Sequence, residues 1–324
     1  MMSPVKVEPV VNLHALVGEG PVWEESEQTL LFVDIMGKKI HRWNPTTNQI
    51  TSCSTDAPVG FAVPARGGGY VAGVGRTFSA VDWSTGAVTS LVTVDDDKPQ
   101  NRLNDGKVDP AGRLFAGTMG LEQSPGEVQR KQGSLFSVDS DLTLIQHLDQ
   151  VDISNGLDWS SDGKLFFYVD SLKKTLDVFD YDVATGRMGT SPRRQLVQSA
   201  VCVTQFDSRR VVFELKDEEG LPDGLTLDAD GKIWICCYNG WRVIQVDPHT
   251  GVRLQTVALP VSKTTSCCFG GPHYSDLYVT SASLGLSQSD LRVQTFAGAT
   301  FRISGLGVKG RPPVEFGGNV LKKN

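Results

Sequence analysis

The amino-acid sequence has no long apolar run and no excess of basic residues. None of its apolar runs reaches the roughly 18 residues that a membrane-spanning helix needs. The 324 residues include 31 basic and 37 acidic side chains, which gives a formal net charge of −6. A partner with a phosphate backbone requires a basic surface, so we expect neither a membrane nor a nucleic-acid partner.

Motifs of several well-known enzyme classes are also absent. The sequence contains no H-E-x-x-H zinc motif and no G-x-S-x-G nucleophile elbow, and no G-x-G-x-x-G motif opens a helix. Ser–His–Asp catalysis and nucleotide binding are therefore not indicated. The histidines are interpreted as surface or packing residues, and they are His14, His41, His147, His249 and His273.

The cysteines do not follow the spacing of a metal cluster or a redox pair. They are Cys53, Cys202, the adjacent pair Cys236 and Cys237, and the adjacent pair Cys267 and Cys268. Neighbours on a strand point to opposite faces, so adjacent cysteines make poor disulfide partners, and no C-x-x-C is present. We predict buried free thiols in strands, with a redox role as the alternative. Since residues 1–10 also lack an apolar signal region, we expect a cytoplasmic protein.

What the sequence does contain is a succession of short strands. Apolar runs of about four to eight residues end at Gly, Pro, Asn or Asp, which is typical of β-structure. The segment 228–231 (DADG) resembles a calcium loop but lacks the glutamate that an EF-hand needs, so it is interpreted as a hairpin turn. Six turns are predicted to place a glycine at positive φ, and these glycines are Gly86, Gly112, Gly163, Gly186, Gly231 and Gly251.

A longer unit of a short strand, a turn and a second strand recurs. Its copies begin near Gly20, Gly60, Gly106, Gly156, Gly224 and Thr265. The steps between the glycines are 40, 46, 50 and 68 residues, and the last copy follows about 40 residues later, a period typical of β-propellers. We predict an all-β, six-bladed β-propeller that forms a single domain over residues 1–324. The longest step predicts an insertion near residues 191–208, and residues 193–219, which lack Gly and Pro, are compatible with either helix or extended strand and loop.

Polar residues stand next to the glycines that open several of these copies. Glu19, Asn155 and Asp223 each directly precede a glycine, as does Asp105, so the four are predicted to share one register. If each copy begins with the innermost strand of a blade, these side chains meet at one mouth of the central channel. Two carboxylates and a carboxamide suit a hard divalent cation and leave positions open for water or substrate. The alternative is that Asn-Gly and Asp-Gly are ordinary turn dipeptides.

Five separated segments resemble the SMP-30/gluconolactonase/luciferin-regenerating-enzyme family. They are residues 18–23, 101–119, 154–159, 222–224 and 263–271, and the resemblance extends over about residues 18–310. It implies a six-bladed propeller with one divalent cation (Ca²⁺, Zn²⁺, Mn²⁺ or Mg²⁺). The residues that match the metal ligands of the family are Glu19, Asn155 and Asp223.

The resemblance also implies hydrolysis of sugar lactones such as glucono-δ-lactone. Arg102 and Asn104 match family residues that contact substrate hydroxyls, and Glu122 matches an acidic residue that faces the substrate. A cation at this site would polarise the lactone carbonyl, and we predict that Asp223 takes the proton from the attacking water. The chain departs from the family pattern in having one acidic residue near position 122 instead of two, and in the insertion near residues 191–208.

Two further functions are compatible with the same site. Luciferin-regenerating proteins and organophosphate hydrolases resemble this architecture, and a fold does not determine a substrate. A non-catalytic, cytosolic calcium-binding regulator would bind metal without turnover. The expected partner is a small sugar lactone, and the expected oligomeric state is a monomer or a weak dimer.

Overall fold

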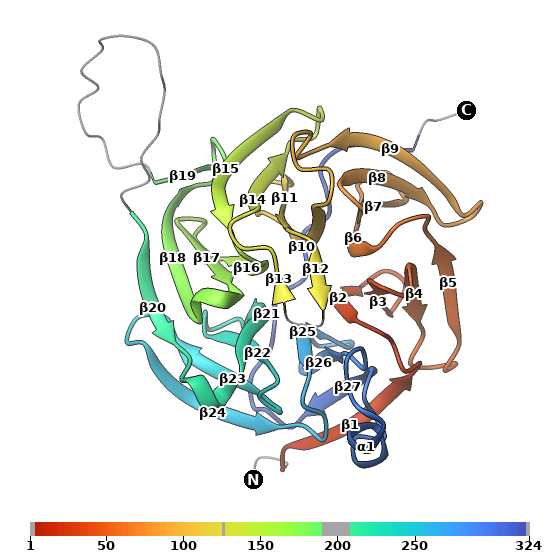
Figure 1. Ribbon diagram of the computed structural model, residues 1–324, viewed down its shortest axis with the longest axis vertical. Helices are drawn as coiled ribbons and strands as arrows, with labels where there is room; N and C mark the ends of the chain where they lie inside the picture. Colours follow the sequence, from red (N-terminus) through yellow and green to blue (C-terminus); the bar gives the residue numbers. More distant parts are fainter. Residues whose placement is uncertain (1–3, 125–126, 190–207, 322–324) are drawn as a thin grey trace.

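The computed structural model describes residues 4–124, 127–189 and 208–321, and these residues form a ring of six antiparallel blades (Figure 1). In every blade the strand that lies nearest the axis is the first strand of a sequence copy. The predicted all-β, six-bladed β-propeller is therefore confirmed, and so is the placement of each copy's start on an innermost strand.

The first three blades follow one another along the chain. Blade 1 consists of β2 (Gly18–Glu24), β3 (Thr29–Asp34), β4 (Lys39–Trp43) and β5 (Ile50–Ser54). Blade 2 consists of β6 (Val59–Pro64), β7 (Tyr70–Val74), β8 (Thr77–Asp82) and β9 (Ala87–Thr93). Blade 3 consists of β10 (Arg102–Val108), β11 (Leu114–Met119), β14 (Gly133–Val138) and β15 (Leu144–Val151). A separate hairpin of β12 (Glu122–Ser124) and β13 (Glu127–Val128) interrupts blade 3.

The other three blades complete the ring. Blade 4 consists of β16 (Ser154–Trp159), β17 (Leu165–Asp170) and β18 (Thr175–Asp182), with β19 (Arg187–Met188) and β20 (Arg210–Glu214) both paired to β18. Blade 5 consists of β21 (Leu221–Leu227), β22 (Ile233–Tyr238), β23 (Arg242–Asp247) and β24 (Val252–Ala258). Blade 6 consists of β25 (Thr264–Gly270), β26 (Asp276–Ser281), β27 (Ala299–Ser304) and β1 (Lys6–Asn12).

Helices are few and short in the described part of the chain. They are the 3₁₀ turns η1 (Ser171–Lys173) and η2 (Asp217–Glu219) and the α-helix α1 (Gln288–Val293). None of the helices in these residues has the length and apolar character needed to cross a bilayer.

Glycine turns join the strands within the blades. All six glycines predicted at turns have a positive φ, between 66° and 94°, a region that costs a residue with a Cβ about 1–2 kcal/mol. The segment 228–231 connects β21 to β22, and the Asp228 carboxylate accepts hydrogen bonds from Lys232 N and Trp234 Nε1. The interpretation of this segment as a hairpin turn is thus confirmed.

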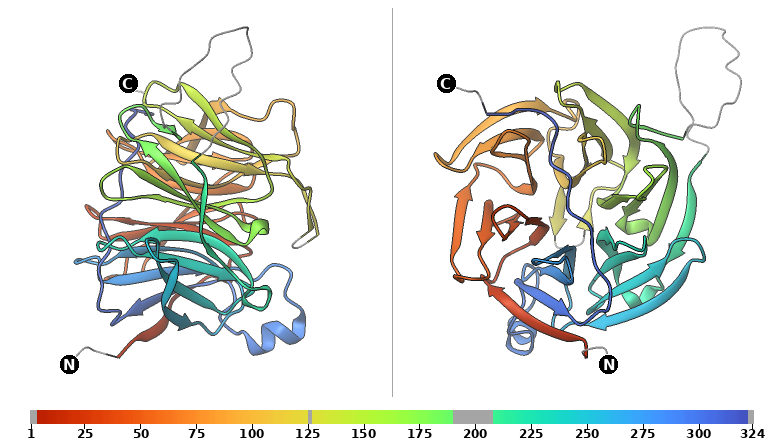
Figure 2. Two further views of the ribbon diagram at one scale, coloured as in Figure 1. Left: turned by 90° about the vertical axis from the view of Figure 1, so that its left-hand side faces the viewer. Right: turned by 180° about the vertical axis from the view of Figure 1, so that it is seen from behind.

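The two ends of the chain lie on different parts of the ring. β1 pairs with β27, so the N-terminal strand completes blade 6 and closes the ring. The C-terminal segment after β27 crosses one face of the propeller, as the right-hand view of Figure 2 shows, and Phe316 N donates to Pro64 O at 2.9 Å. The letters of residues 305–310 match G-x-G-x-x-G, but they belong to this segment and open no helix.

Aromatic side chains fill the space between neighbouring blades. Trp23 of blade 1 stacks on Tyr278 of blade 6, with ring centroids 5.5 Å apart and planes within 3°. Phe115 and Trp159 make an edge contact at 5.2 Å between blades 3 and 4. Contacts of this kind add stabilisation to the burial of large apolar side chains, and they hold the innermost strands at fixed positions around the axis.

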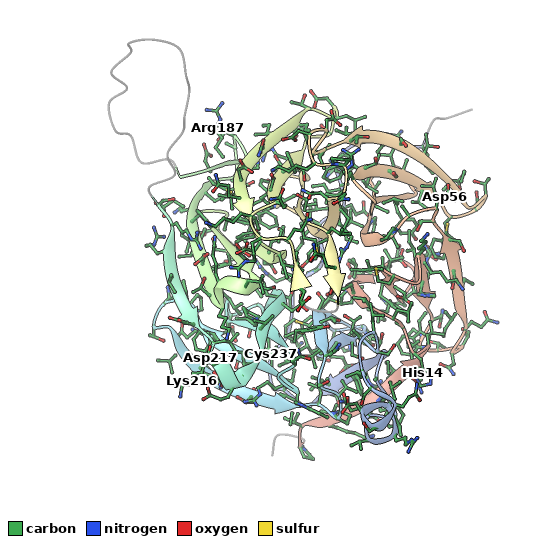
Figure 3. The ribbon with its side chains drawn as sticks, viewed as in Figure 1. His14, Asp56, Arg187, Lys216, Asp217 and Cys237 are labelled. Carbon is green, nitrogen blue, oxygen red and sulfur yellow. The ribbon has the colours of Figure 1, made fainter. Side chains whose placement is uncertain are left out.

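The cysteines and histidines of the described residues lie in strands, in the core and at the surface. The five cysteines in the described residues are free thiols on strands, of which Cys268 alone is half-buried, whereas Cys202 lies outside the described residues. His41 and His147 are buried, and His14 lies at the edge of the ring (Figure 3). These residues therefore have the packing and surface roles that were expected.

The predicted insertion near residues 191–208 lies almost entirely outside the described residues. The described part of the stretch 193–219 contains β20 and η2. That part is mainly extended strand and loop, with a single 3₁₀ turn at η2.

His147 should make the fold sensitive to acid. Burial lowers the pKa of His147 to about 4, while its ring stacks on Phe115 and shares a 2.7 Å hydrogen bond with Ser137 Oγ. The unfolded chain titrates this residue near pH 6.5 and therefore binds more protons than the folded state between these two values. Stability is consequently lost as the pH falls through this window.

We expect His147→Gln to reduce the loss of unfolding free energy between about pH 7 and pH 4.5 by on the order of 2 kcal/mol. Denaturant unfolding of both proteins across this range measures the difference. Parallel pH profiles for the wild type and the variant would contradict the assignment.

Candidate metal and substrate site

Each of the six innermost strands contains a β-bulge at the same level of the ring. The pairing to the second strand shifts between Glu19/Val22, Val59/Ala62, Leu103/Gly106, Ser154/Leu157, Pro222/Leu225 and Thr264/Cys267. Each bulge leaves two residues without a ladder partner and bends the strand. The predicted metal ligands and Asn104 all lie at these bulges, in the layer where the innermost strands surround the axis.

The prediction that Glu19, Asp105, Asn155 and Asp223 share one register is wrong. Asn155 and Asp223 are the first unpaired residues of their bulges, and Asn104 rather than Asp105 occupies the equivalent position in blade 3. Glu19 still pairs with the second strand of its blade, one position earlier. A following glycine does not define a ladder position, because the glycine occupies a different place in the bulge from blade to blade.

The glycines at these bulges allow neighbouring blades to approach each other. A Cβ on Gly156 would lie 2.6 Å from Asp223 O, and one on Gly224 would lie 2.6 Å from Ser266 Cα. The Asn-Gly and Asp-Gly pairs are inside strands and are not turn dipeptides. In each pair the first residue supplies a polar side chain, and the glycine leaves room for the adjacent strand.

Three buried carboxylates gather in this layer. Glu19, Asp105 and Asp223 are 5%, 8% and 6% exposed. Burial raises the pKa of Glu19 well above its usual range, and Asp223 and Asp105 raise it further. Burial also raises the pKa of Asp223, again with a contribution from Asp105, and raises that of Asp105 to about 6. Each of the three carboxylates is thus desolvated and close to another negative charge.

The hydrogen bonds of these carboxylates are incomplete. Gly20 N donates to Glu19 Oε2 at 3.0 Å, and Gly106 N donates to Asp105 Oδ1 at 2.7 Å. Asp223 Oδ1, by contrast, is buried and has no hydrogen-bond partner among the described residues. A buried polar atom without a partner costs about 1–3 kcal/mol, so this oxygen is a strong candidate for contact with a ligand.

A chain of hydrogen bonds orients the polar side chains of blades 3 and 4. Arg102 Nη1 donates to Asn104 Oδ1 at 2.6 Å. Asn104 Nδ2 in turn donates to Asn155 Oδ1 at 3.0 Å and to Ser154 O at 2.8 Å. Asn155 Nδ2 donates to Ser171 Oγ at 2.8 Å, which directs the carboxamide oxygen away from η1. The amide group of Asn104 is therefore already engaged, and its predicted contact with a substrate hydroxyl stays a prediction.

Arg102 lies among the acidic groups of the site. Burial lowers the pKa of its guanidinium, while Glu122, Glu19 and Asp223 raise it. Glu122 belongs to the β12–β13 hairpin, which reaches from blade 3 toward the axis in Figure 1 and projects from the face opposite the C-terminal segment in the left view of Figure 2. The structure thus brings four of the predicted residues, Arg102, Glu122, Glu19 and Asp223, within electrostatic reach of one another.

Three residues near the site were missed by the sequence analysis. Ser171 orients Asn155 from η1, and Tyr238 has its pKa raised by burial and then by Asp223, Glu122 and Glu19. Lys263 lies against the Tyr238 ring at 5.4 Å. Lys263 stands in one of the segments that carry the family resemblance, but nothing in its sequence spacing indicates a role.

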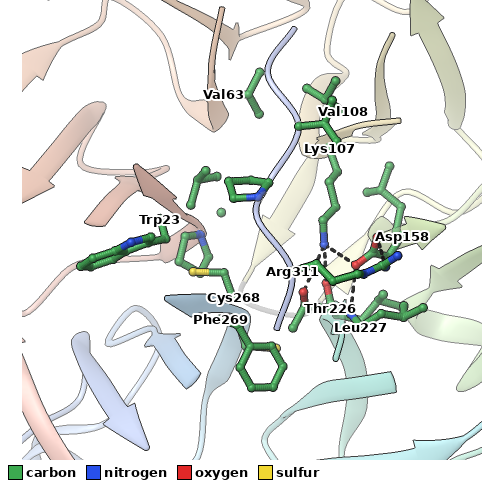
Figure 4. A pocket seen from close by; sticks show the side chains of 18 of the residues that line it. Trp23, Val63, Lys107, Val108, Asp158, Thr226, Leu227, Cys268, Phe269 and Arg311 are labelled. Carbon is green, nitrogen blue, oxygen red and sulfur yellow. Dashed lines mark hydrogen bonds and ion pairs between the residues drawn. The ribbon is translucent and has the colours of Figure 1, made fainter. Parts of the chain in front are cut away.

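A cavity of ≈ 200 Å³ lies at a second level of the ring, beyond the bulges (Figure 4). Its lining includes Asp105, Lys107 and Asp158, and residues 311–314 of the C-terminal segment border it. Lys107 Nζ and Asp158 Oδ2 form an ion pair at 2.7 Å there. None of the six predicted site residues lines this cavity, so it is a different space from the predicted substrate site.

The residues present fit a single divalent cation. Within the described ranges, no three His, Cys, Asp or Glu side chains gather closely enough to hold a metal ion. The predicted set includes only two residues of these types, Glu19 and Asp223, and needs the Asn155 oxygen as the third ligand. The unpartnered Asp223 oxygen and the desolvated carboxylates are the features that a dication would satisfy. The ligand set itself stays a prediction.

Comparisons with known proteins identify relatives that match most or nearly all of this chain. A family profile described as "SMP-30/Gluconolactonase/LRE-like region" matches residues 17–283. Regucalcin of Xenopus laevis is 50% identical over 317 residues, which cover 98% of this chain and 100% of that protein.

Solved structures give the same architecture. A luciferin-regenerating enzyme aligns with a TM-score of 0.85 at 33% identity, covering 97% of this chain and 100% of that one. A calcium-binding protein, regucalcin, from Agrobacterium tumefaciens aligns with a TM-score of 0.84 at 23% identity, covering 97% of each chain, and shows the fold alone. The resemblance identified from the five sequence segments is confirmed.

Asp223→Asn should stabilise the protein in the presence of a chelator. The substitution keeps the shape of the side chain but removes one of three desolvated carboxyl groups whose proximity raises the pKa of Glu19 and Asp223. We expect the free energy of unfolding at neutral pH to rise by about 1 kcal/mol, as is common when a functional charge is removed.

Denaturant unfolding in chelator measures this change. Asp228→Asn is the matched control, because Asp228 is buried with hydrogen bonds from Trp234 Nε1 and Gln245 Nε2, and its loss should destabilise the fold. Equal destabilisation by both substitutions would show that Asp223 is a structural residue.

Proposed function

Because the chain belongs to the SMP-30/gluconolactonase/LRE-like family, we propose that it is a divalent-metal-dependent sugar lactone hydrolase. The observation that carries this proposal is the buried Asp223 oxygen, which has no hydrogen-bond partner in the part of the chain that the structure describes and which lies near the desolvated Glu19 carboxylate and the Arg102 guanidinium. A buried polar atom without a partner lowers the stability of the fold. Ionisable groups with strongly perturbed pKa values are typical of functional sites.

Glu19, Asn155 and Asp223 would hold the cation. When bound, a divalent cation supplies Lewis-acid polarisation of the lactone carbonyl and lowers the pKa of a water molecule. Ser171 keeps the Asn155 carboxamide oriented by accepting its N–H. An all-oxygen set of three protein ligands discriminates little among Ca²⁺, Mg²⁺, Mn²⁺ and Zn²⁺, so we propose one divalent cation without naming the physiological one.

The other roles at the site are proton transfer and the orientation of the substrate. Asp223 would accept the proton of the attacking water, since one of its oxygens accepts no hydrogen bond from the described residues. Arg102, a rigid donor fixed by Asn104, would orient the lactone. Asn104 and Glu122 would exchange hydrogen bonds with the ring hydroxyls. A lactone is an activated ester, so modest stabilisation of the developing oxyanion is sufficient.

The names of the relatives favour one second candidate. Regucalcins and a calcium-binding structural neighbour support a calcium-binding regulator that uses the same ligands without turnover. The luciferin-regenerating enzyme supports a third use of the site, in which a different substrate is hydrolysed. In all three cases we propose a cytoplasmic protein that acts as a monomer or weak dimer on small molecules.

A metal add-back assay tests the proposal. Chelated protein should not hydrolyse glucono-δ-lactone, and one or more of Ca²⁺, Mg²⁺, Mn²⁺ and Zn²⁺ should restore turnover. Asn155→Ala and Asp223→Asn should lose both metal retention and at least about 99% of the activity, since each removes a ligand. Because Asp223→Asn is expected to remain folded, its inactivity would not be due to unfolding.

Three outcomes would be decisive. Full lactonase activity in chelator, or in Asp223→Asn, would remove the metal and the base from the mechanism. Calcium binding without turnover of any lactone would favour the regulator instead. Turnover of another ester or phosphoester, but of no sugar lactone, would assign the site to a different hydrolase.

Arg102→Met is expected to raise the KM for glucono-δ-lactone by about 10- to 100-fold, the effect of losing a charged hydrogen bond to substrate. Steady-state kinetics at saturating metal measure this change. Metal affinity should not fall, because Arg102 supplies no ligand and its positive charge opposes a cation. An unchanged KM would exclude Arg102 from the substrate site.

A further inference from the structure

The cavity beyond the bulges is bordered on its outer side by the C-terminal segment. Ala229 N, in the turn between β21 and β22, donates to Lys309 O at 2.7 Å, and Phe316 N donates to Pro64 O of blade 2 at 2.9 Å. Between these anchors the segment crosses the centre of the ring (Figure 2), and residues 311–314 line the cavity. All six innermost strands supply the rest of the wall.

One side of this cavity is apolar. Figure 4 shows Trp23 and Phe269 on that side, and Leu157 and Leu225 also belong to the wall. The cavity has a volume of ≈ 200 Å³. An apolar cavity of about 150 Å³ in another protein holds a benzene molecule. The space is therefore large enough for a single aromatic ring that carries a small polar group.

The opposite side of the cavity carries two cations and one carboxylate, which meet in Figure 4. Lys107 Nζ donates to Asp158 Oδ2 at 2.7 Å and to Thr226 Oγ1 at 3.4 Å. Arg311 Nη2 donates to Trp159 O at 2.9 Å and lies 3.8 Å from Asp158 Oδ1. This side of the wall thus has one positive charge more than its single carboxylate balances.

The acceptors on this side are used more fully than the donors. Asp158 Oδ2 also accepts from Leu227 N at 2.9 Å, and Asp158 Oδ1 accepts from Trp159 N at 2.8 Å. Three of the roughly four lone-pair positions of this carboxylate are therefore occupied. Arg311 has five N–H donors, and within the described residues its guanidinium makes one hydrogen bond. The spare capacity consists of cationic donors, which suit a carboxylate.

We propose that this cavity is a second ligand site, which binds a small aromatic monocarboxylate. The ring lies against Trp23 and Phe269, and the carboxylate accepts hydrogen bonds from Arg311, with Lys107 as the second cation. Asp105 borders the cavity at the level of the bulges and repels an anion, so the carboxylate points toward the C-terminal segment. The site is independent of the proposed lactonase function, because none of the six predicted site residues lines it.

Three probes of nearly the same shape test this proposal. Benzoate, benzamide and benzamidinium carry a negative, a neutral and a positive group on the same ring. Calorimetric titrations in chelator give the Kd of each probe, and the chelator prevents benzoate from binding through a metal ion. Benzoate should bind at least about tenfold more tightly than benzamide, the effect of one charged hydrogen bond, and benzamidinium should bind most weakly.

Two results of these titrations would overturn the proposal. One is equal affinity for the three probes or a preference for benzamidinium, which would show that the surplus positive charge does not select the ligand. The other is the absence of detectable benzoate binding at millimolar concentration. Both results are obtained without turnover, so they stand whether or not the protein hydrolyses lactones.

Arg311→Met and Arg102→Met form a matched pair, because each removes one guanidinium from a different level of the ring. Arg311→Met should weaken benzoate binding by about tenfold or more and leave benzamide unchanged, and Arg311→Lys should recover part of the loss. Arg102→Met should change neither affinity. The reverse pattern would place benzoate in the layer of buried carboxylates and overturn the proposal. Arg311 lies outside the blades, so its substitution should not prevent folding.

The position of the bound probe can be read from tryptophan signals. Benzoate should shift the indole N–H NMR signals of Trp23 and Trp159, which line the cavity, and not that of the exposed Trp241. Trp23→Phe, Trp159→Phe and Trp241→Phe assign these signals. A shift confined to Trp241 would contradict the proposed position.

Filling the cavity provides an independent check. Cys268 is half-buried and belongs to the wall, so Cys268→Phe should weaken the binding of all three probes by occupying the space of their ring. Unchanged benzoate affinity in this variant would overturn the proposal. If Cys268→Phe does not fold, the affinities of Arg311→Met and Arg102→Met still decide it.

Discussion

The mutual repulsion of three buried carboxylates is the constraint on which the rest of this propeller depends. Glu19, Asp105 and Asp223 belong to three different blades, and each innermost strand must come close enough to its neighbours to place them together. Without a cation this arrangement opposes folding. The closure of blade 6 by β1 and the aromatic contacts between blades offset the cost, so the scaffold stabilises a layer that is unfavourable by itself.

The fold was predictable because a unit of a short strand, a turn and a second strand recurs along the sequence. The glycines of the innermost strands recur every 40 to 68 residues, and turns of several blades place a further glycine at positive φ, as at Gly112, Gly163 and Gly231. The ring closure left no such signal. The pairing of β1 with β27 joins residues almost 300 positions apart, and no local pattern in either strand specifies its partner.

The site was predictable only in part. Asn155 and Asp223 were found through the glycines that follow them, yet those glycines serve the approach of neighbouring blades, and the register inferred from them fails for Glu19 and Asp105. The bulges that set the true register depend on pairing with the second strand, which the sequence does not display. Lys263 was missed for a related reason: it lies against the Tyr238 ring of blade 5, and no local pattern in the sequence reveals a contact between blades.

The two levels of the ring differ in chemistry, and this difference indicates where a sugar lactone would bind. Beyond the bulges, the cavity wall consists largely of side chains such as Trp23, Leu157 and Phe269, and Lys107 and Asp158 already form an ion pair. A polyhydroxylated ligand would lose hydrogen bonds to water there and regain few. The level of the hairpin offers charged and amide groups near the unpartnered Asp223 oxygen. Under the proposed function, the ring hydroxyls and the reacting carbonyl of a lactone would therefore bind on the hairpin side of the carboxylate layer.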